Sequence, residues 1–256
     1  MSDTPAEFAK RYLAYKVPVG DQPRTVTVEL KALRYRNAAR EGFTAQSPEM
    51  LAKDAVAGKG AGFVAAIQAA FSGKGSPDGI TKALELVAKH GLWEKGYPEW
   101  GEDLKKQSIP IEDKLRLYCD KMIGLDCLGF VVNYVQSQQK LLLDLSPLNA
   151  DLKNFRGTPL VPRSTLLEFR SGDVVVWNEP PRHIALIGSG SPASQAPGLA
   201  LGFPIVMAAA DPNFGPEGLV ISSFILKPGG ALGTYSLVGK SRSDTVRVFG
   251  PVVPIF

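Results

Sequence analysis

The chain has 256 residues, of which 45% are hydrophobic and 21% are charged, and this composition excludes a wholly disordered protein. Its 26 glycines and 20 prolines favour a fold with many turns over a helix bundle. The formal net charge of +4 suits an anionic polymer as a partner, but the surplus is too small to indicate a nucleic-acid-binding protein.

The first hundred residues are predicted to be mostly helical, with one short strand. Residues 25–30 alternate between polar and apolar side chains, which indicates that strand. Helix starts follow at 47–49 and 76–78, where a serine precedes a proline. The tripeptide Gly-Lys-Gly occurs at 58–60 and again at 73–75. Neither copy has the remaining residues of a phosphate-binding loop, so both are interpreted as loop caps.

A segment rich in glycine, proline and charged residues, 93–110, is the candidate boundary between two regions. We expect residues 1–110 to form an N-terminal region of unknown role and residues 111–256 to form a second domain. In the second domain, helical segments at 111–118 and 127–139 come before a run of short apolar segments typical of strands. Those segments are 174–177, 184–187, 204–209 and 219–224. Helices followed by strands predict an α+β fold.

Cys127 lies at the expected N-terminus of the helix 127–139. The positive end of a helix macrodipole favours a thiolate over a thiol, and the thiolate is the nucleophilic form of cysteine. The first backbone amides of the helix are also placed to donate to an oxyanion. The alternative interpretation is that Cys127 is a small buried hydrophobic residue, which is the most common role of a free cysteine.

A cysteine nucleophile needs a base, and the chain contains two histidines. His90 ends a predicted helix and precedes Gly91, so we expect it to interact with the last carbonyl groups of that helix. His183 follows a proline-containing turn and directly precedes the apolar segment 184–187, so it stands at the edge of a sheet. We therefore expect His183 to be the partner of Cys127.

The cysteines and histidines also limit what else the chain binds. Two of each, with no Cys-x-x-Cys or His-Glu-x-x-His motif, leave no ordinary set of zinc ligands. Two cysteines cannot build a disulfide framework. We expect neither a metal nor another cofactor.

The segments around these two residues resemble a known family. Gly-Leu-Asp-Cys-Leu-Gly-Phe-Val at 124–131 is similar to the first motif of the NlpC-type cysteine peptidases, Gly-hydrophobic-Asp-Cys-Ser-Gly-Phe-Val. Gly-Asp-Val-Val-Val-Trp at 172–177, with His-Ile-Ala-Leu-Ile-Gly at 183–188, resembles the second motif. The order and the separation of Cys127 and His183 also agree with the family.

The resemblance covers roughly residues 111–226 and implies a papain-like core, in which the nucleophile helix packs on an antiparallel sheet. It implies hydrolysis of amide bonds in peptidoglycan stem peptides through an acyl-enzyme, with Cys127 as nucleophile and His183 as base. Two other functions stay open. One is an inactive papain-like module that binds the wall or a partner protein, and the other is an acyltransferase or lipid amidase on the same fold.

The chain departs from the family at two places. Leu128 stands where the family usually has serine. The family's third polar residue orients the histidine from the next strand, but the matching positions 207–209 are apolar here. Three arrangements then remain: a dyad without a third residue, a backbone carbonyl group as the orienting acceptor, or recruitment of Asp211.

The start of the chain predicts where it acts. Its first residues carry mixed charges without the apolar core of a secretory signal, and no apolar run has the length of a membrane span. We expect a chain that is cytoplasmic as synthesised. A wall hydrolase would then need a non-classical route, with a secretion apparatus or an inhibitor protein as a partner. The alternative is a cytoplasmic enzyme that acts on recycled wall peptides.

Overall fold

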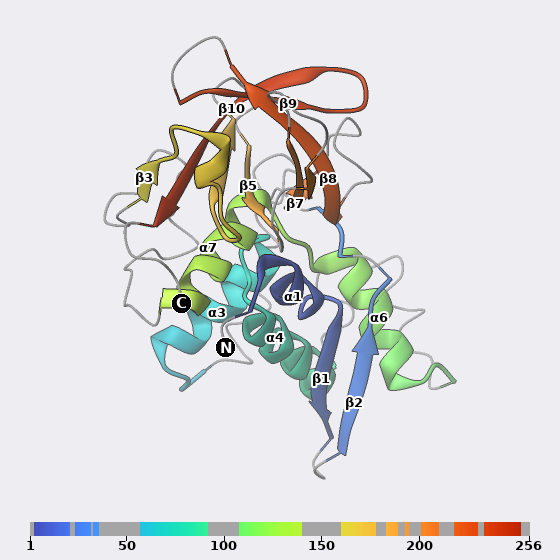
Figure 1. Ribbon diagram of the computed structural model, residues 1–256. Helices are drawn as coiled ribbons and strands as arrows, with labels where there is room; N and C mark the ends of the chain where they lie inside the picture. The colour runs from blue at the N-terminus through green and yellow to red at the C-terminus, as the bar shows by residue number, and fades with distance from the viewer. Residues whose placement is uncertain are drawn as a thin grey trace.

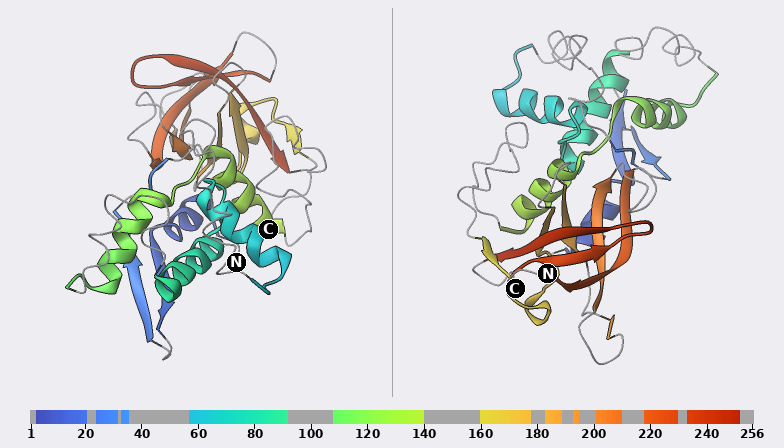
Figure 2. Two further views of the ribbon diagram at one scale, coloured as in Figure 1. Left: turned by 180° about the vertical axis from the view of Figure 1, so that it is seen from behind. Right: turned by 90° about the horizontal axis from the view of Figure 1, so that it is seen from above.

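The chain folds into a β-barrel on one side and a group of helices with a β-hairpin on the other (Figure 1, Figure 2). This computed structural model describes residues 3–20, 24–31, 33–35, 57–91, 108–139, 160–177, 183–188, 193–194, 201–209, 218–229 and 233–251. Among these residues, no helix combines the length and the apolar character needed to cross a membrane.

The first part of the described chain combines helices with a hairpin. Strand β1 (Ala14–Val19) pairs antiparallel with β2 (Arg24–Glu29), so the strand predicted at 25–30 is confirmed and gains a partner that was not predicted. The helices are α1 (Pro5–Lys10), α3 (Ala61–Phe71), α4 (Pro77–His90), α6 (Ile111–Met122) and α7 (Cys127–Gln139). The helix start predicted at 47–49 lies outside the described residues, as do residues 93–107 of the candidate boundary.

The second part forms an antiparallel barrel. In order around the barrel, its strands are β10 (Ser243–Pro251), β4 (Val174–Trp177), β5 (Ile184–Ile187), β7 (Leu201–Ala209), β8 (Gly218–Pro228) and β9 (Tyr235–Val238). The ring closes because β9 pairs with β8 on one side and with β10 on the other. Two short strands lie beside it, β3 (Leu160–Pro162) along β10 and β6 (Ala193–Ser194) along β7. A single 3-10 turn, η1 (Leu166–Glu168), precedes β4.

Both faces of the barrel wall are buried around β4 and β5, which explains the continuous apolar runs in these two strands. Val175 and Trp177 point into the barrel and join its core. Val174 and Ile184 belong instead to the cluster formed by the helices against the outside of the wall. The interior core comprises Phe169, Val175, Trp177, Ala185, Ile187, Phe203, Ile205, Met207, Ala209, Phe224, Leu226, Tyr235, Leu237, Val246 and Val248.

The predicted papain-like core is wrong. Helix α7 does pack against β5 and β7, but these strands belong to a closed barrel and not to an antiparallel sheet with a helix on one face. Alternating side chains and turn residues predict that strands exist. They do not report whether the last strand pairs back to the first, and here the pairing of β9 with two neighbours closes the ring.

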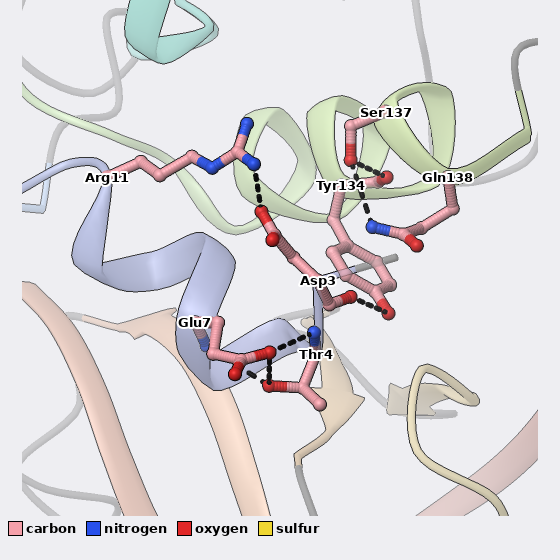
Figure 3. Close-up of polar contacts among 7 residues, drawn as sticks. All are labelled: Asp3, Thr4, Glu7, Arg11, Tyr134, Ser137 and Gln138. Atoms are coloured by element: carbon pink, nitrogen blue, oxygen red, sulfur yellow. Dashed lines mark hydrogen bonds and ion pairs between the residues drawn. The ribbon is translucent and has the colours of Figure 1, made fainter. Parts of the chain in front are cut away.

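Helix α1 connects the N-terminal residues to α7 (Figure 3). Thr4 caps α1 in a reciprocal pair of hydrogen bonds with Glu7. The hydroxyl of Tyr134, on α7, donates to the carbonyl oxygen of Asp3 at 3.3 Å. Arg11 forms an ion pair with the side chain of Asp3, so the residues on either side of α1 meet at α7.

One hydrophobic cluster extends across the boundary expected near residue 110. Phe8 and Tyr12 each pack against Phe130 of α7, with ring centroids 6.1 Å apart in both pairs. The cluster also includes buried residues of α3, α4, α6 and the outer wall of the barrel. Residues 1–110 and 111–256, expected as two regions, therefore contribute to the same core.

The first turn of α7 packs so closely against the loop at 73–75 that a side chain at Gly129 has no room. An added Cβ would overlap the carbonyl oxygen of Gly73 and would lie 2.7 Å from the Cα of Lys74. Because both are backbone atoms, neither can rotate away. We predict that Gly129→Ala lowers the free energy of unfolding by about 1–3 kcal/mol, as overpacked cores do, measured by urea unfolding followed by circular dichroism.

Gly62→Ala is the matched control, because an added Cβ at this position in α3 meets no atom within 4 Å. Replacing a helical glycine by alanine there should leave the stability unchanged or raise it by about 0.5–1 kcal/mol. Equal unfolding midpoints for the two variants would contradict the close contact at Gly129.

Candidate active site

The N-terminus of α7 begins at the cysteine because the aspartate before it caps the helix. Oδ1 of Asp126 accepts the backbone N–H of Gly129 at 2.5 Å, which is the bond that an N-cap residue makes to the third residue of a helix. Cys127 is therefore the first helical residue, and the helix predicted at 127–139 is confirmed. Its backbone and side chain lie at the positive end of the helix dipole.

The sulfur of Cys127 lies at the junction of α7 and β5. The backbone amides of Leu128 on α7 and Ile184 on β5 lie close enough to the sulfur to favour its ionised form. The residue is only 8% exposed. The thiol therefore lies against the outer wall of the barrel, at the first residue of the strand that follows His183.

Burial raises the pKa of the Cys127 thiol to about 11, and the neighbouring carboxylate of Asp126 acts in the same direction. Three groups lower the pKa, but together they do not offset the effect of burial: the Ile184 amide, Lys74 and the Leu128 amide. The effect expected from the helix N-terminus, which favours a thiolate, is therefore smaller than the effect of burial in the resting protein. Desolvation of the charged form outweighs the dipole and the hydrogen bonds.

His183 is held by strand β4. Its carbonyl oxygen accepts the backbone N–H of Trp177 at 3.0 Å. Its imidazole packs edge-on against the indole of Trp177, with ring centroids 4.9 Å apart and an interplanar angle of 75°. The indole N–H in turn donates to Oδ2 of Asp244 at 3.2 Å, so β4 and β10 together fix the aromatic surface against which the imidazole lies.

The structure brings Cys127 next to the segment that carries His183, but it does not bring the two side chains together. The thiol lies beside the backbone amide of Ile184, the residue directly after His183. The side chains differ in their surroundings, because the thiol faces the cluster outside the barrel whereas the imidazole contacts Trp177, a residue of the interior core.

Strand β7, which pairs with β5, has an apolar residue opposite His183. Leu186 pairs with Val206, and Ile187 pairs with Ile205. Continuing this antiparallel register places Ala209, a buried residue, opposite His183. Asp211, the other candidate for the third residue, lies outside the described part of the chain.

The Gly-Asp pair of the second motif has a structural role at the start of β4. Gly172 adopts a left-handed conformation with φ of 88°, which favours glycine. Asp173 is fully buried and accepts two hydrogen bonds from the guanidinium of Arg163, at 2.9 and 3.0 Å. A third bond, at 2.8 Å, comes from the backbone N–H of Arg170. These bonds fix the entry into the strand that holds His183.

His90 is exposed at the end of α4, and Gly91 follows it in the left-handed conformation with φ of 59°. The predicted glycine cap of this helix is confirmed. Ser76 also caps the start of α4 as predicted, because its hydroxyl accepts the N–H of Gly79 at 3.0 Å.

Lys74 is a residue of the site that the sequence patterns do not indicate. The second Gly-Lys-Gly was interpreted as a loop cap, but the structure places it against the first turn of α7. Nζ of Lys74 lies 2.8 Å from Oδ2 of Asp126, and both side chains are mostly buried. Two glycines around a lysine are a signal for close approach of a backbone, yet the sequence does not indicate which distant segment it approaches.

Within the described ranges, no three histidine, cysteine, aspartate or glutamate side chains gather in a way that could hold a metal ion. Comparisons of the chain with protein families, with curated proteins and with solved structures found no match.

The buried thiol should react slowly at neutral pH. Alkylation requires the thiolate, so we predict that labelling of Cys127 by iodoacetamide rises with a midpoint well above the value of about 8.5 for an unperturbed cysteine. Pulse labelling at increasing pH, followed by mass spectrometry of the peptide that contains Cys127, measures this midpoint. Cys119 serves as an internal control, because it is fully buried and should be labelled only when the protein unfolds. A midpoint at or below that of free cysteine would contradict the burial of the thiol.

Proposed function

We propose that the protein is a cysteine hydrolase that cleaves amide bonds, with Cys127 as nucleophile and His183 as general base. One observation carries the proposal: the thiol at the start of α7 lies beside the first amide of β5, the strand that begins directly after His183. The reaction then requires the imidazole to turn from Trp177 toward the sulfur. The two motifs that resemble the NlpC-type peptidases meet at this junction. Because the papain-like core is excluded, the resemblance supports the proposal through these motifs and not through the fold.

The raised pKa of Cys127 determines how the proton moves in this mechanism. A thiol with a pKa of about 11 is protonated at neutral pH, so His183 removes the proton as the sulfur attacks, and no thiolate stands ready beforehand. The C–S bond forms at the amide carbonyl carbon while the carbonyl electrons move to the oxygen. The protonated imidazole then gives its proton to the leaving amine, and water releases the acyl group from Cys127.

The start of α7 can stabilise the charge that develops on the substrate. The helix dipole favours negative charge beside the sulfur, and the Leu128 amide is the donor of the first turn that acts on Cys127, whereas the Gly129 amide is bonded to the Asp126 cap. Leu128, which replaces the serine of the family motif, contributes its amide without a side-chain hydroxyl. The replacement therefore leaves the backbone donor in place.

The substrate class that we propose is the peptide part of peptidoglycan. The motif resemblance supports this choice, and the net charge of +4 suits an anionic wall. The other two functions have support of their own. The 8% exposure of Cys127 and the apolar Ala209 opposite His183 favour an inactive binding module. An acyltransferase or lipid amidase would use the same acyl-enzyme, and a nucleophilic amine added to the assay would then produce an aminolysis product.

The proposal predicts that Cys127→Ala and His183→Ala each reduce the hydrolysis of purified muropeptides by a factor on the order of 10³ or more, because each removes one member of a unit that works together. Release of new amines, resolved by liquid chromatography, measures turnover. His90→Ala is the control and should keep the wild-type rate, since this residue is exposed at the end of α4. Wild-type turnover by a folded Cys127→Ala protein would contradict the proposal.

The same variants test where the reaction takes place. We propose that the protein acts on the cell wall after delivery by a non-classical route. Expression in the cytoplasm of a Gram-negative host should then be harmless, whereas fusion to a periplasmic export signal should lyse the cells. The exported Cys127→Ala variant should not lyse them. If the exported wild-type protein is present and folded but the cells grow, the alternative of an enzyme for recycled wall peptides replaces the delivery proposal.

A further inference from the structure

The loop at 73–75 is bonded to the helix that carries the nucleophile. The backbone N–H of Asp126 donates to the carbonyl oxygen of Gly73 at 2.7 Å. The side-chain amide of Asn133 donates to the carbonyl oxygen of Lys74 at 3.0 Å and to that of Gly129 at 2.7 Å. The hydroxyl of Tyr12 holds the other end of the loop through the carbonyl oxygen of Gly75, at 3.2 Å. The position of Lys74 is therefore set by its backbone and does not depend on its own ion pair alone.

Lys74 and Asp126 form a buried ion pair directly beside Cys127. Their side chains are 18% and 12% exposed, and the ammonium nitrogen lies 2.8 Å from Oδ2. The other carboxylate oxygen, Oδ1, accepts the N–H of Gly129 as the helix cap. Burial raises the pKa of this carboxyl, and Lys74 with the backbone amides of Gly129 and Leu128 acts in the opposite direction, so the lysine is needed to keep the group ionised. A carboxylate at this depth without its cation would be strongly destabilised.

The charge of Asp126 acts on the thiol that follows it in the chain. A carboxylate beside a cysteine disfavours the thiolate, whereas a nearby ammonium group favours it. The pKa of Cys127 shows both effects, since Asp126 raises it and Lys74 lowers it. The residues of β5, 184–187, and of β7, 201–209, contain no ionisable side chain, and His183, which precedes β5, packs against Trp177. Tyr12, which senses the charge of Asp126, stays protonated because burial raises its pKa.

We propose that Lys74 is a positioning residue for Cys127, which neutralises the capping carboxylate and so keeps a negative charge from suppressing the thiolate beside it. The role deepens the proposed function, because it assumes that Cys127 is the nucleophile. Asp126 caps α7 so that the helix begins at Cys127, but its negative charge disfavours the Cys127 thiolate. Lys74 offsets that charge.

Three variants test this role through the thiol itself. Lys74→Met removes the cation and keeps much of the apolar stem, Lys74→Arg keeps the charge, and Asp126→Asn keeps a capping side chain without the charge. The measurement is the rate constant for alkylation of Cys127 by iodoacetamide at one fixed pH below the midpoint, read by mass spectrometry. In that range each unit of change in the thiol pKa alters the thiolate fraction about tenfold.

We expect Lys74→Met to slow labelling about threefold to tenfold and Lys74→Arg to stay within about threefold of the wild type. Asp126→Asn should speed labelling about tenfold, because Lys74 then faces the thiol without a counter-charge. If the ion pair were purely structural, the variants would change the unfolding midpoint. Lys74→Met would then not slow labelling, and Asp126→Asn would not speed it.

Labelling of folded Lys74→Met at the wild-type rate would overturn the role of Lys74. If Lys74→Met does not fold, the double variant Lys74→Met/Asp126→Asn, which leaves no unpaired charge, decides: slower labelling than in Asp126→Asn supports the role, and an equal rate overturns it. These outcomes concern the thiol alone. Failure of the proposed hydrolase would appear as turnover that does not depend on Cys127, so the two failures are distinguishable.

Discussion

The contact between the first turn of α7 and the outer wall of the barrel is the constraint on which the rest of the site depends. On one side, α7 packs against β5, and the sulfur of Cys127 lies beside the amide of Ile184. On the other side, the loop at 73–75 presses against Gly129 and pairs its lysine with Asp126. The helix start is thus held between a strand of the barrel and a loop from the helical part. Neither part alone would define the surroundings of the thiol.

Holding the helix start in this way has an electrostatic cost. The contacts that fix Cys127 also exclude water from it, and desolvation becomes the largest effect on its pKa. Backbone amides and the Lys74 ammonium offset part of that effect. The thiol therefore stays protonated until a base acts on it. In the proposed mechanism that base is His183, whose ring packs against Trp177 and must turn toward the sulfur to act on it.

Local features of this protein could be predicted from its sequence, whereas the features that depend on distant contacts could not. The helix from Cys127, the caps at Ser76 and Gly91, and the strands at 174–177 and 184–187 follow from patterns within a few residues, and all are confirmed. The barrel was not predicted, because its closure depends on β9 pairing with two strands. The ion pair between Lys74 and Asp126 joins residues that are 52 positions apart, and no local pattern reports it. The burial that raises the pKa of the thiol also arises from the tertiary structure and has no local pattern.

Capture of the acyl-enzyme is the measurement that tests the central claim most directly. The protein is mixed with a stem-peptide substrate, quenched in acid within the first turnover and digested, and the peptide that contains Cys127 is weighed by mass spectrometry. The account predicts that this peptide gains the mass of the acyl portion of the substrate, and that no adduct forms in Cys127→Ala. Hydrolysis without an acyl group on Cys127, or with the acyl group on another residue, would contradict the account.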